Sequence, residues 1–311
     1  MVAFSPSEDQ QMIVNMVKQF ATDEMRKIYR HCDESGDIPQ GVIDKAWGMG
    51  FASSAIPEKF GGAGEERSAV TASLLAEELA WGDLSMGMHI LSPSLFVVPV
   101  LLSGTEEQKA KYLPAFCGQK FHTATAALLE PRFNFDANAL VTTAARKNGI
   151  KHDRDELTLD NCRVPAENRL GGEKGCDFSL LHNCSRVALA AMSVGVAKAA
   201  FEYSRDYAKT RVAFGEPIAS RQAIAFMLAE MAMEIDATRL LAWEAAWLLD
   251  KKRDATKEAY LLKNYADDMV LMVTDRSVQI LGGHGYIREH PVELYLRNGR
   301  GFATFDGMAM I

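Results

Sequence analysis

Asp306, close to the C-terminal end of the chain, is the side chain best suited to acid–base chemistry. It stands between Phe305 and Gly307. A carboxylate can remove a proton from a substrate when burial raises its pKa toward neutral pH. Taken alone, however, Asp306 is an aspartate in a loop, and most such residues are only solvated. The rest of the sequence has to decide between these two interpretations.

Arg211 carries a group that suits a phosphate ligand. Its guanidinium is a rigid fork that can hold a pyrophosphate, and Phe214 and Gly215 follow it closely. The simpler interpretation is a surface arginine that complements the dipole of a helix ending near Thr210. Without further context, we favour that simpler interpretation.

A glycine cluster at residues 282–285 allows a second kind of phosphate contact. The glycines would let the backbone approach a phosphate or an adenosine closely. The cluster lacks the G-x-G-x-x-G spacing and follows no strand, which disfavours a Rossmann site. Taken alone, it is more simply the C-cap of a helix, where glycine permits a left-handed conformation.

Metal and serine chemistry are not supported by the motifs. The seven histidines show neither H-x-x-x-H nor H-E-x-x-H spacing. No G-x-S-x-G motif is present, so the sequence offers no nucleophilic serine of the hydrolase type.

The elements that must position these residues are mostly helical over residues 1–120. Ser5, followed by Pro6 and Glu8, predicts the N-cap of a first helix. Thr105 predicts a second capping box, and Pro114 limits the helix that it opens. Further helices are expected over 42–49, 70–81 and 91–102, with a turn-rich loop over 56–64.

The pattern changes over residues 121–165 and again after 176. Short β-compatible segments at 123–128, 139–144 and 157–159 predict a thin β-containing insert. From 176 to about 281 the pattern indicates three long helices. Met227, Met231 and Ile235 repeat every fourth residue, a stripe that we interpret as the core of a helical bundle.

Composition excludes several classes of partner. A net charge of -7 argues against nucleic acid, and no apolar run approaches the ~20 residues of a membrane span. The five cysteines include no C-x-x-C pair, which favours reduced thiols over a disulfide framework. The N-terminal residues enter a helix signal without a leader. We therefore expect a soluble cytoplasmic protein without nucleic-acid or membrane partners.

Several motifs, in order along the chain, resemble those of the acyl-CoA dehydrogenase family of flavoenzymes. They are Ile56-Pro57-Glu58-Lys59-Phe60-Gly61-Gly62, Gly104-Thr105-Glu106-Glu107-Gln108-Lys109, Val164-Pro165-Ala166-Glu167-Asn168, the segments 211–222 and 279–286, and Phe305-Asp306-Gly307. Each motif is weak alone. In this order, and on matching helices or loops over nearly the whole chain, they identify the chain as similar to that family.

The resemblance implies a mainly α fold in three parts. These are a helical N-terminal domain (1–120), a reduced middle β-domain (121–170) and a C-terminal four-helix bundle (171–311). It also implies a homo-oligomer, by family habit a tetramer built as a dimer of dimers. FAD would lie between subunits, held by residues of the neighbouring chain, namely Arg211, Phe214, Gln279, Gly282 and Gly283, with help from Gln222.

The implied activity is α,β-dehydrogenation of an acyl-CoA thioester, with electrons passed to an electron-transfer flavoprotein. Asp306 matches the base that removes the α-proton, while the β-hydrogen leaves as hydride to the flavin N5. The backbone N–H of residue 306 and a flavin ribityl hydroxyl would hold the thioester oxygen. Arg186 matches the substrate-side arginine of the family, and Asn183 stands where the family often has aspartate.

The chain departs from the family at the base itself. Asp306 replaces a glutamate, which shortens the side chain by ~1.5 Å, and a misplacement of that size can cost roughly 100-fold in rate. Nitroalkane oxidase and certain divergent relatives use aspartate, so Asp306 is compatible with catalysis. On the flavin side, Arg132, Phe133 and Phe135 replace small residues of the family.

A part of the family's β-domain has no counterpart between Gly149 and Leu157. The absent part includes a strand that flanks the flavin, and so thin an insert cannot satisfy its sheet edges. Two explanations stay open: a true deletion, or a segment that the given sequence omits. We favour omission, because both flanks still match the family. Met308 and Met310 also stand where the family often has threonine and glutamine beside the flavin.

Three hypotheses follow. The favoured one is an FAD-dependent acyl-CoA dehydrogenase. The second is an oxidase of the same fold that acts on a non-CoA substrate such as a nitroalkane, motivated by Asp306. The third is a catalytically silent paralogue that acts as a flavin-free scaffold, motivated by Phe133, Phe135 and the missing strand.

Overall fold

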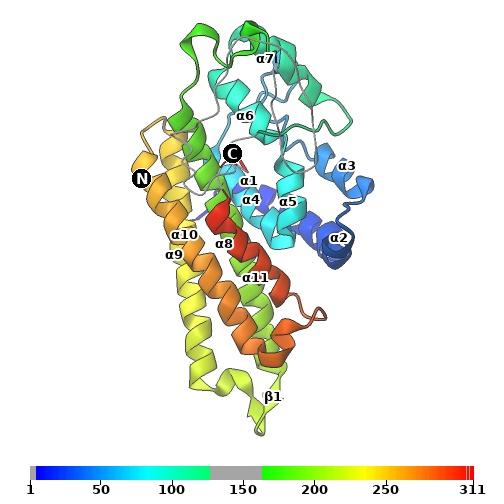
Figure 1. Cartoon of the computed structure of the whole chain (residues 1–311), viewed down its shortest axis with the longest axis vertical. Coiled ribbons are helices and arrows are strands. Elements are labelled where there is room, and N and C mark those ends of the chain that lie inside the picture. The colour runs from blue at the N-terminus through cyan, green and yellow to red at the C-terminus, as the bar shows by residue number, and fades with distance from the viewer. Residues whose placement is uncertain (1–4, 127–162, 306, 308) are drawn as a thin grey trace.

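The protein consists of a long helical bundle with a group of shorter helices packed around one end (Figure 1). The computed structural model describes residues 5–126, 163–305, 307 and 309–311. Within these residues, the strands form one hairpin, β1 (Val212–Ala213) and β2 (Glu216–Pro217). The mainly α fold predicted from the sequence is therefore confirmed.

The N-terminal region folds into short helices whose ends follow local capping signals. Ser7 caps α1: its hydroxyl accepts from Gln10 N at 3.2 Å, and its own N–H donates to the Gln10 side chain at 3.0 Å. The predicted cap at Ser5 was wrong by two residues, because Gln10 supplies the reciprocal bond. The helices are α1 (Glu8–Phe20), a π-helical turn (Ala21–Met25), α2 (Tyr29–Ser35), α3 (Gln40–Gly48), α4 (Ala69–Gly82), α5 (Leu84–Leu91), α6 (Ser94–Ser103) and α7 (Glu106–Tyr112).

The helix predicted over 91–102 is α6, which begins three residues later than predicted. α5 ends at Leu91 and α6 begins at Ser94, with a bend of 40° between them. Pro93 explains the break, because proline lacks the N–H that a continuous helix would need there. Hydrophobic periodicity runs through this break and so could not reveal it.

The middle region shows little regular structure where it is described. Residues 121–126 form no strand, and 163–177 contain the 3₁₀ turns Ala166–Asn168 and Gly172–Lys174. The segments 139–144 and 157–159, together with Arg132, Phe133 and Phe135, lie outside the described residues. The β-containing insert therefore stays a prediction.

The C-terminal region is built from the three predicted long helices and a fourth, shorter one: α8 (Phe178–Thr210), α9 (Gln222–Asp250), α10 (Thr256–Leu281) and α11 (Val292–Gly301). The chain runs down α8, up α9, down α10 and up α11 (Figure 1). Met231 and Ile235 are buried in the bundle, as the stripe predicted, and Met227 packs against them from the edge.

Helix α4 joins the N-terminal region to the bundle through buried charges. Glu77 accepts from Arg239 of α9 at 3.0 and 3.1 Å, and Glu78 accepts from Lys198 of α8. Gly195 lets the two backbones approach, since a Cβ there would lie 2.1 Å from the Glu77 carbonyl oxygen. The two regions therefore share one core.

Helix α8 is long and apolar enough to span a membrane by length and composition, and so is the bent pair α5–α6. Within α8, 83% of the most apolar window is buried inside the bundle. That burial accounts for its composition, because a core helix must be apolar on every side.

Candidate functional site

The residues predicted to bind a cofactor gather at one end of the bundle. Arg211 and Phe214 follow the end of α8, Gln222 begins α9, and the turn with Gly282 and Gly283 follows the end of α10, so that all lie at the end marked β1 in Figure 1. All of them, Gln279 included, are exposed. The fold thus brings into one region the predicted cofactor residues, which are far apart along the chain.

The hairpin holds Phe214 out from the protein in a strained conformation. Phe214 and Gly215 form its two-residue turn, with φ values of 56° and 86°, a pattern typical of a type I′ turn. The Phe214 side chain is 96% exposed, and its ring meets the Arg221 guanidinium at 5.8 Å. A large aromatic residue with positive φ costs on the order of 1 kcal/mol, so this conformation suggests a function outside the single chain.

The backbone at Gly282 and Gly283 is open to a ligand. Gly282 ends α10 with φ 57° and ψ −131°, a conformation that favours glycine. The left-handed C-cap predicted here is therefore wrong, because the ψ of Gly282 lies outside the left-handed helical region. A Cβ at either glycine would meet nothing within 4 Å. The guanidinium of Arg211 has no ion-pair partner among the described residues. Open backbone, an unpaired cation and an exposed ring fit a nucleotide cofactor such as FAD.

The predicted substrate residues lie near the other end of α8. Asn183 is 4% exposed, and its amide donates to the Thr256 hydroxyl at 3.0 Å. The Arg186 guanidinium is half-buried and lies 5.3 Å from the centre of the Tyr260 ring. Both side chains thus contact α10, and Asn183 is engaged within the protein.

Asp306 and Met308 lie outside the described residues, so the position of the candidate base stays a prediction. The flanking residues are described: Phe305 is partly buried, and Gly307 is buried with φ 65°, a conformation that favours glycine. Further along, Met310 is buried against the first turns of α8.

Lys263 of α10 fixes the residues that lead to Phe305. Its ammonium donates to the Phe302 carbonyl at 2.9 Å and to the Asp267 carboxylate at 2.7 and 2.8 Å. The Phe302 and Phe305 rings meet edge to face at 5.5 Å between centroids. No motif pointed to Lys263, whose helical position alone does not reveal a contact 39 residues away.

A largely apolar cavity of about 400 Å³ lies between α6 and the start of α8. Its lining includes Leu95 and Phe96 of α6, Leu181 and His182 of α8, and Met310. A space of this size and character suits a small organic ligand. The sequence did not predict it, because its walls come from six separate stretches of the chain, between Leu95 and Met310.

Ser185, one turn further along α8, has an unusual side chain. It is fully buried, and its hydroxyl has no hydrogen-bond partner among the described residues. The other buried serines of α8, Ser193 and Ser204, donate to carbonyls of the preceding turn at 2.7 and 2.8 Å. A buried hydroxyl without a partner calls for an explanation, and a ligand is one.

The two groups of residues are too far apart to meet within one chain. The 33 residues of α8 span about 50 Å at ~1.5 Å per residue. By the same rise, the 25 residues from Arg186 to Arg211 correspond to roughly 38 Å. A site that uses both groups therefore needs more than one copy of the chain.

Comparisons with known proteins agree over nearly the whole chain. The family model described as "Acyl-CoA dehydrogenase, N-terminal domain" matches residues 7–120, and the one described as "Acyl-CoA dehydrogenase, C-terminal domain" matches 180–311. The caffeyl-CoA reductase-Etf complex subunit CarC of Acetobacterium woodii is 32% identical, over 98% of this chain and 96% of its own. An acyl-CoA dehydrogenase of Bacillus subtilis is 31% identical, over 97% and 95%.

Solved structures show the same fold. Butyryl-CoA dehydrogenase from Megasphaera elsdenii superposes with a TM-score of 0.85 at 26% identity, covering 97% of this chain and 95% of its own. The alignment with CarC extends over 368 positions, 57 more than the 311 residues of this chain. In at least 57 of these positions, CarC therefore has a residue and this chain has a gap. A gap of this length agrees with the missing part of the β-domain.

Proposed function

Because the chain belongs to the acyl-CoA dehydrogenase family of FAD-dependent oxidoreductases, we propose that it catalyses α,β-dehydrogenation of an acyl-CoA thioester. One observation carries the proposal: open, unpaired cofactor-type groups lie at one end of α8, and an apolar cavity lies at the other. Bound FAD supplies the acceptor for the hydride that leaves the β-carbon.

Asp306 is the proposed base for the α-proton. The described residues that follow it, Gly307 and Met310, are buried. The cavity beside Leu181 would receive the acyl chain. Arg186 and Asn183 would contact the CoA part of the substrate.

The proposed assembly is a homo-oligomer, a dimer of dimers, in which each chain completes its partner's cofactor site. The ~38 Å between Arg186 and Arg211 supports this arrangement. A second support is the surface of α9, where Phe226, Met233 and Leu240 repeat every seventh residue and are 61%, 62% and 38% exposed. Apolar residues at this spacing form a stripe that suits packing against another helix.

The proposed electron acceptor is an electron-transfer flavoprotein. CarC, which is similar over nearly the whole chain, is named as a subunit of an Etf complex. We propose a cytoplasmic location, since the described cysteines Cys32, Cys117, Cys176 and Cys184 are all free. Nucleic acid and membranes are not proposed as partners.

The test is to purify the protein and measure bound flavin by absorbance. Anaerobic addition of acyl-CoAs of different chain length should bleach the flavin of an active dehydrogenase, and an electron-transfer flavoprotein should restore it. Oxygen uptake with a nitroalkane and no thioester would instead favour the oxidase. A protein without flavin, even after incubation with FAD, would support the scaffold hypothesis and exclude our proposal.

A further inference from the structure

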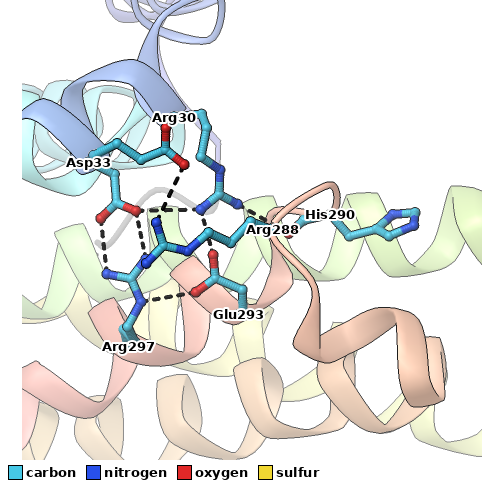
Figure 2. A network of polar contacts seen from close by, with 7 residues as sticks. Arg30, Asp33, Arg288, His290, Glu293 and Arg297 are labelled. Atoms are coloured by element: carbon cyan, nitrogen blue, oxygen red, sulfur yellow. Dashed lines mark hydrogen bonds and ion pairs between the residues drawn. The ribbon is translucent and has the colours of Figure 1, made fainter.

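A cluster of charged side chains connects α2 to α11, and the proposed function leaves it without a role. Arg30 donates to Glu293 at 2.5 Å, and Arg297 donates to both oxygens of Asp33 at 2.7 and 2.9 Å. Arg297 also donates to Glu293 at 2.9 Å. Figure 2 shows that these four side chains converge between the two helices. We call Arg30, Asp33, Glu293 and Arg297 the α2–α11 clamp.

The clamp is partly buried, and its carboxylates are charged. The side chains of Arg30, Asp33 and Glu293 are only 21%, 15% and 18% exposed. Hydrogen bonds from Arg297 lower the pKa of Asp33, against burial. Burial alone would raise the pKa of Glu293, but the hydrogen bonds from Arg297 and Arg30 outweigh it and lower that pKa. Both carboxylates therefore stay charged at neutral pH.

His290 links the clamp to the glycine turn. Its carbonyl accepts from Arg30 at 3.2 Å, and its ring Nδ1 lies 2.7 Å from the Tyr203 hydroxyl of α8. The His290 ring also meets the rings of Tyr207 and His284 edge to face, with centroids 5.6 and 5.5 Å apart. His284 belongs to the turn Gly282–Tyr286 itself. A continuous set of contacts thus runs from α2 to the turn.

The exposed part of the glycine turn, Gly282 and Gly283, is the part that such support would serve, because Gly285 of the same turn is already buried close to Val278. Gly282 and Gly283 are exposed, and a Cβ at either position would meet nothing within 4 Å. Glycine also loses the most conformational freedom on ordering. A turn that binds a ligand through its backbone binds better when neighbouring residues hold it in the bound shape beforehand.

We propose that Tyr203, His290 and Arg30 are positioning residues for the glycine turn, and that they preorganise it for the flavin nucleotide. The inference rests on the proposed function, in which this turn contacts FAD. Because that FAD belongs to the neighbouring chain, α2 of one subunit sets the cofactor affinity of its partner. None of the three residues needs to touch the cofactor.

The test compares FAD affinity with stability in the full-length protein. Tyr203→Phe removes one hydroxyl from the set of contacts, and Tyr265→Phe removes a matched hydroxyl that donates to Glu234 on an exposed surface. Fluorescence titration of the apoprotein gives the Kd for FAD, and thermal unfolding of the apoprotein gives Tm. Tyr203→Phe should raise the Kd for FAD about fivefold, which corresponds to the free energy of one lost hydrogen bond. The Tm of Tyr203→Phe should match that of Tyr265→Phe.

Three further variants separate positioning from charge. His290→Asn keeps an amide that can donate or accept near the position of the ring Nδ1 and should retain most of the affinity, whereas His290→Leu should not. Arg30→Lys keeps the ion pair with Glu293 but loses the second N–H, and should weaken FAD binding.

The outcomes distinguish the inference from the function that it rests on. Wild-type protein that binds no FAD overturns the proposed function. If the wild-type protein binds FAD and the Kd of Tyr203→Phe lies within twofold of the wild-type Kd, only the positioning role is overturned. An equal loss of affinity in Tyr265→Phe also overturns it, because the effect would then be general destabilisation.

Discussion

The two ends of α8 differ in how completely one chain builds them. At the Arg211 end, Phe214 is 96% exposed with positive φ, and the glycine turn has open backbone. At the Arg186 end, Asn183 and Ser185 are buried, and several segments of the same chain line a largely apolar cavity. The first end carries strain that no contact among the described residues relieves, whereas the described residues of the second end are packed inside the protein. Exposed strain of this kind marks a surface that another molecule completes.

The largest expected effect concerns the proposed base. Asp306→Asn should lower turnover by about 1,000-fold, because a general base contributes typically 10²–10⁴-fold. FAD content and Tm should not change, since the amide has almost the same shape. Steady-state assay with an electron-transfer flavoprotein measures the rate, and Asp306→Glu serves as the control that keeps the carboxylate. Unchanged turnover in Asp306→Asn would remove this residue from the mechanism.

At the exposed end, Arg211→Met should weaken FAD binding by about 10- to 100-fold. This fold-change corresponds to the free energy that one charge-assisted hydrogen bond contributes. Tm of the apoprotein should stay the same, because Arg211 has no ion-pair partner among the described residues. Titration of the apoprotein with FAD measures the affinity. Arg205→Met, which removes an exposed cation bonded to Asp206, is the matched control. A fall in Tm without a change in affinity would show that Arg211 supports the fold instead.

The α2–α11 clamp predicts a pH effect on stability. The native pKa values of Asp33 and Glu293 are lowered, so their stabilisation is complete above their ordinary values near pH ~4. This stabilisation is lost as the pH falls through the lowered native pKa values of the two carboxyl groups. Arg297→Met should cost about 1–2 kcal/mol at pH 7, a figure reduced because Arg297 is 50% exposed.

Urea unfolding of both proteins at pH 7 and at acid pH measures this difference. The wild-type advantage over Arg297→Met should shrink at the lower pH, where both carboxylates take up protons. A constant difference between the two proteins across pH would mean that the clamp stabilises through packing instead of charge.

The smallest expected effect tests the strain at Phe214 directly. Phe214→Asn should raise the free energy of unfolding of the apoprotein by about 0.5–1 kcal/mol, because asparagine tolerates positive φ better. The same variant should bind FAD less well, since the ring is lost. Chemical denaturation and FAD titration check the two halves. Loss of stability would indicate that the ring packs within its own chain.

The sequence predicted the long helices well and the short ones less well. α8 to α10 carry apolar stripes over many turns, so their pattern outweighs local exceptions. The break at Pro93 was missed because apolar residues continue on both sides of it. The first cap was displaced by two residues, since Ser5 and Ser7 offer the same hydroxyl and only the position of Gln10 distinguishes them.

The sequence could propose site residues only where a motif is local, and their roles stay predictions. Arg211 and Phe214 lie within one hairpin, and Gly282 and Gly283 lie within one turn. The clamp could not be predicted, because Arg30 and Glu293 are 263 residues apart and each is an ordinary charged residue on a helix. Ser185 escaped notice for a similar reason: its missing hydrogen bond becomes visible only beside Ser193 and Ser204.

The length of α8 has a genetic consequence under the proposed assembly. A chain with a defect at Arg211 damages its partner's site, whereas a chain with a defect at Asp306 damages its own. Two such inactive variants, expressed together, should form mixed dimers in which one of the two sites has both residues intact. Complementation between two alleles of one gene is the expected signature, and co-expression of Arg211→Met with Asp306→Asn would reveal it as recovered activity.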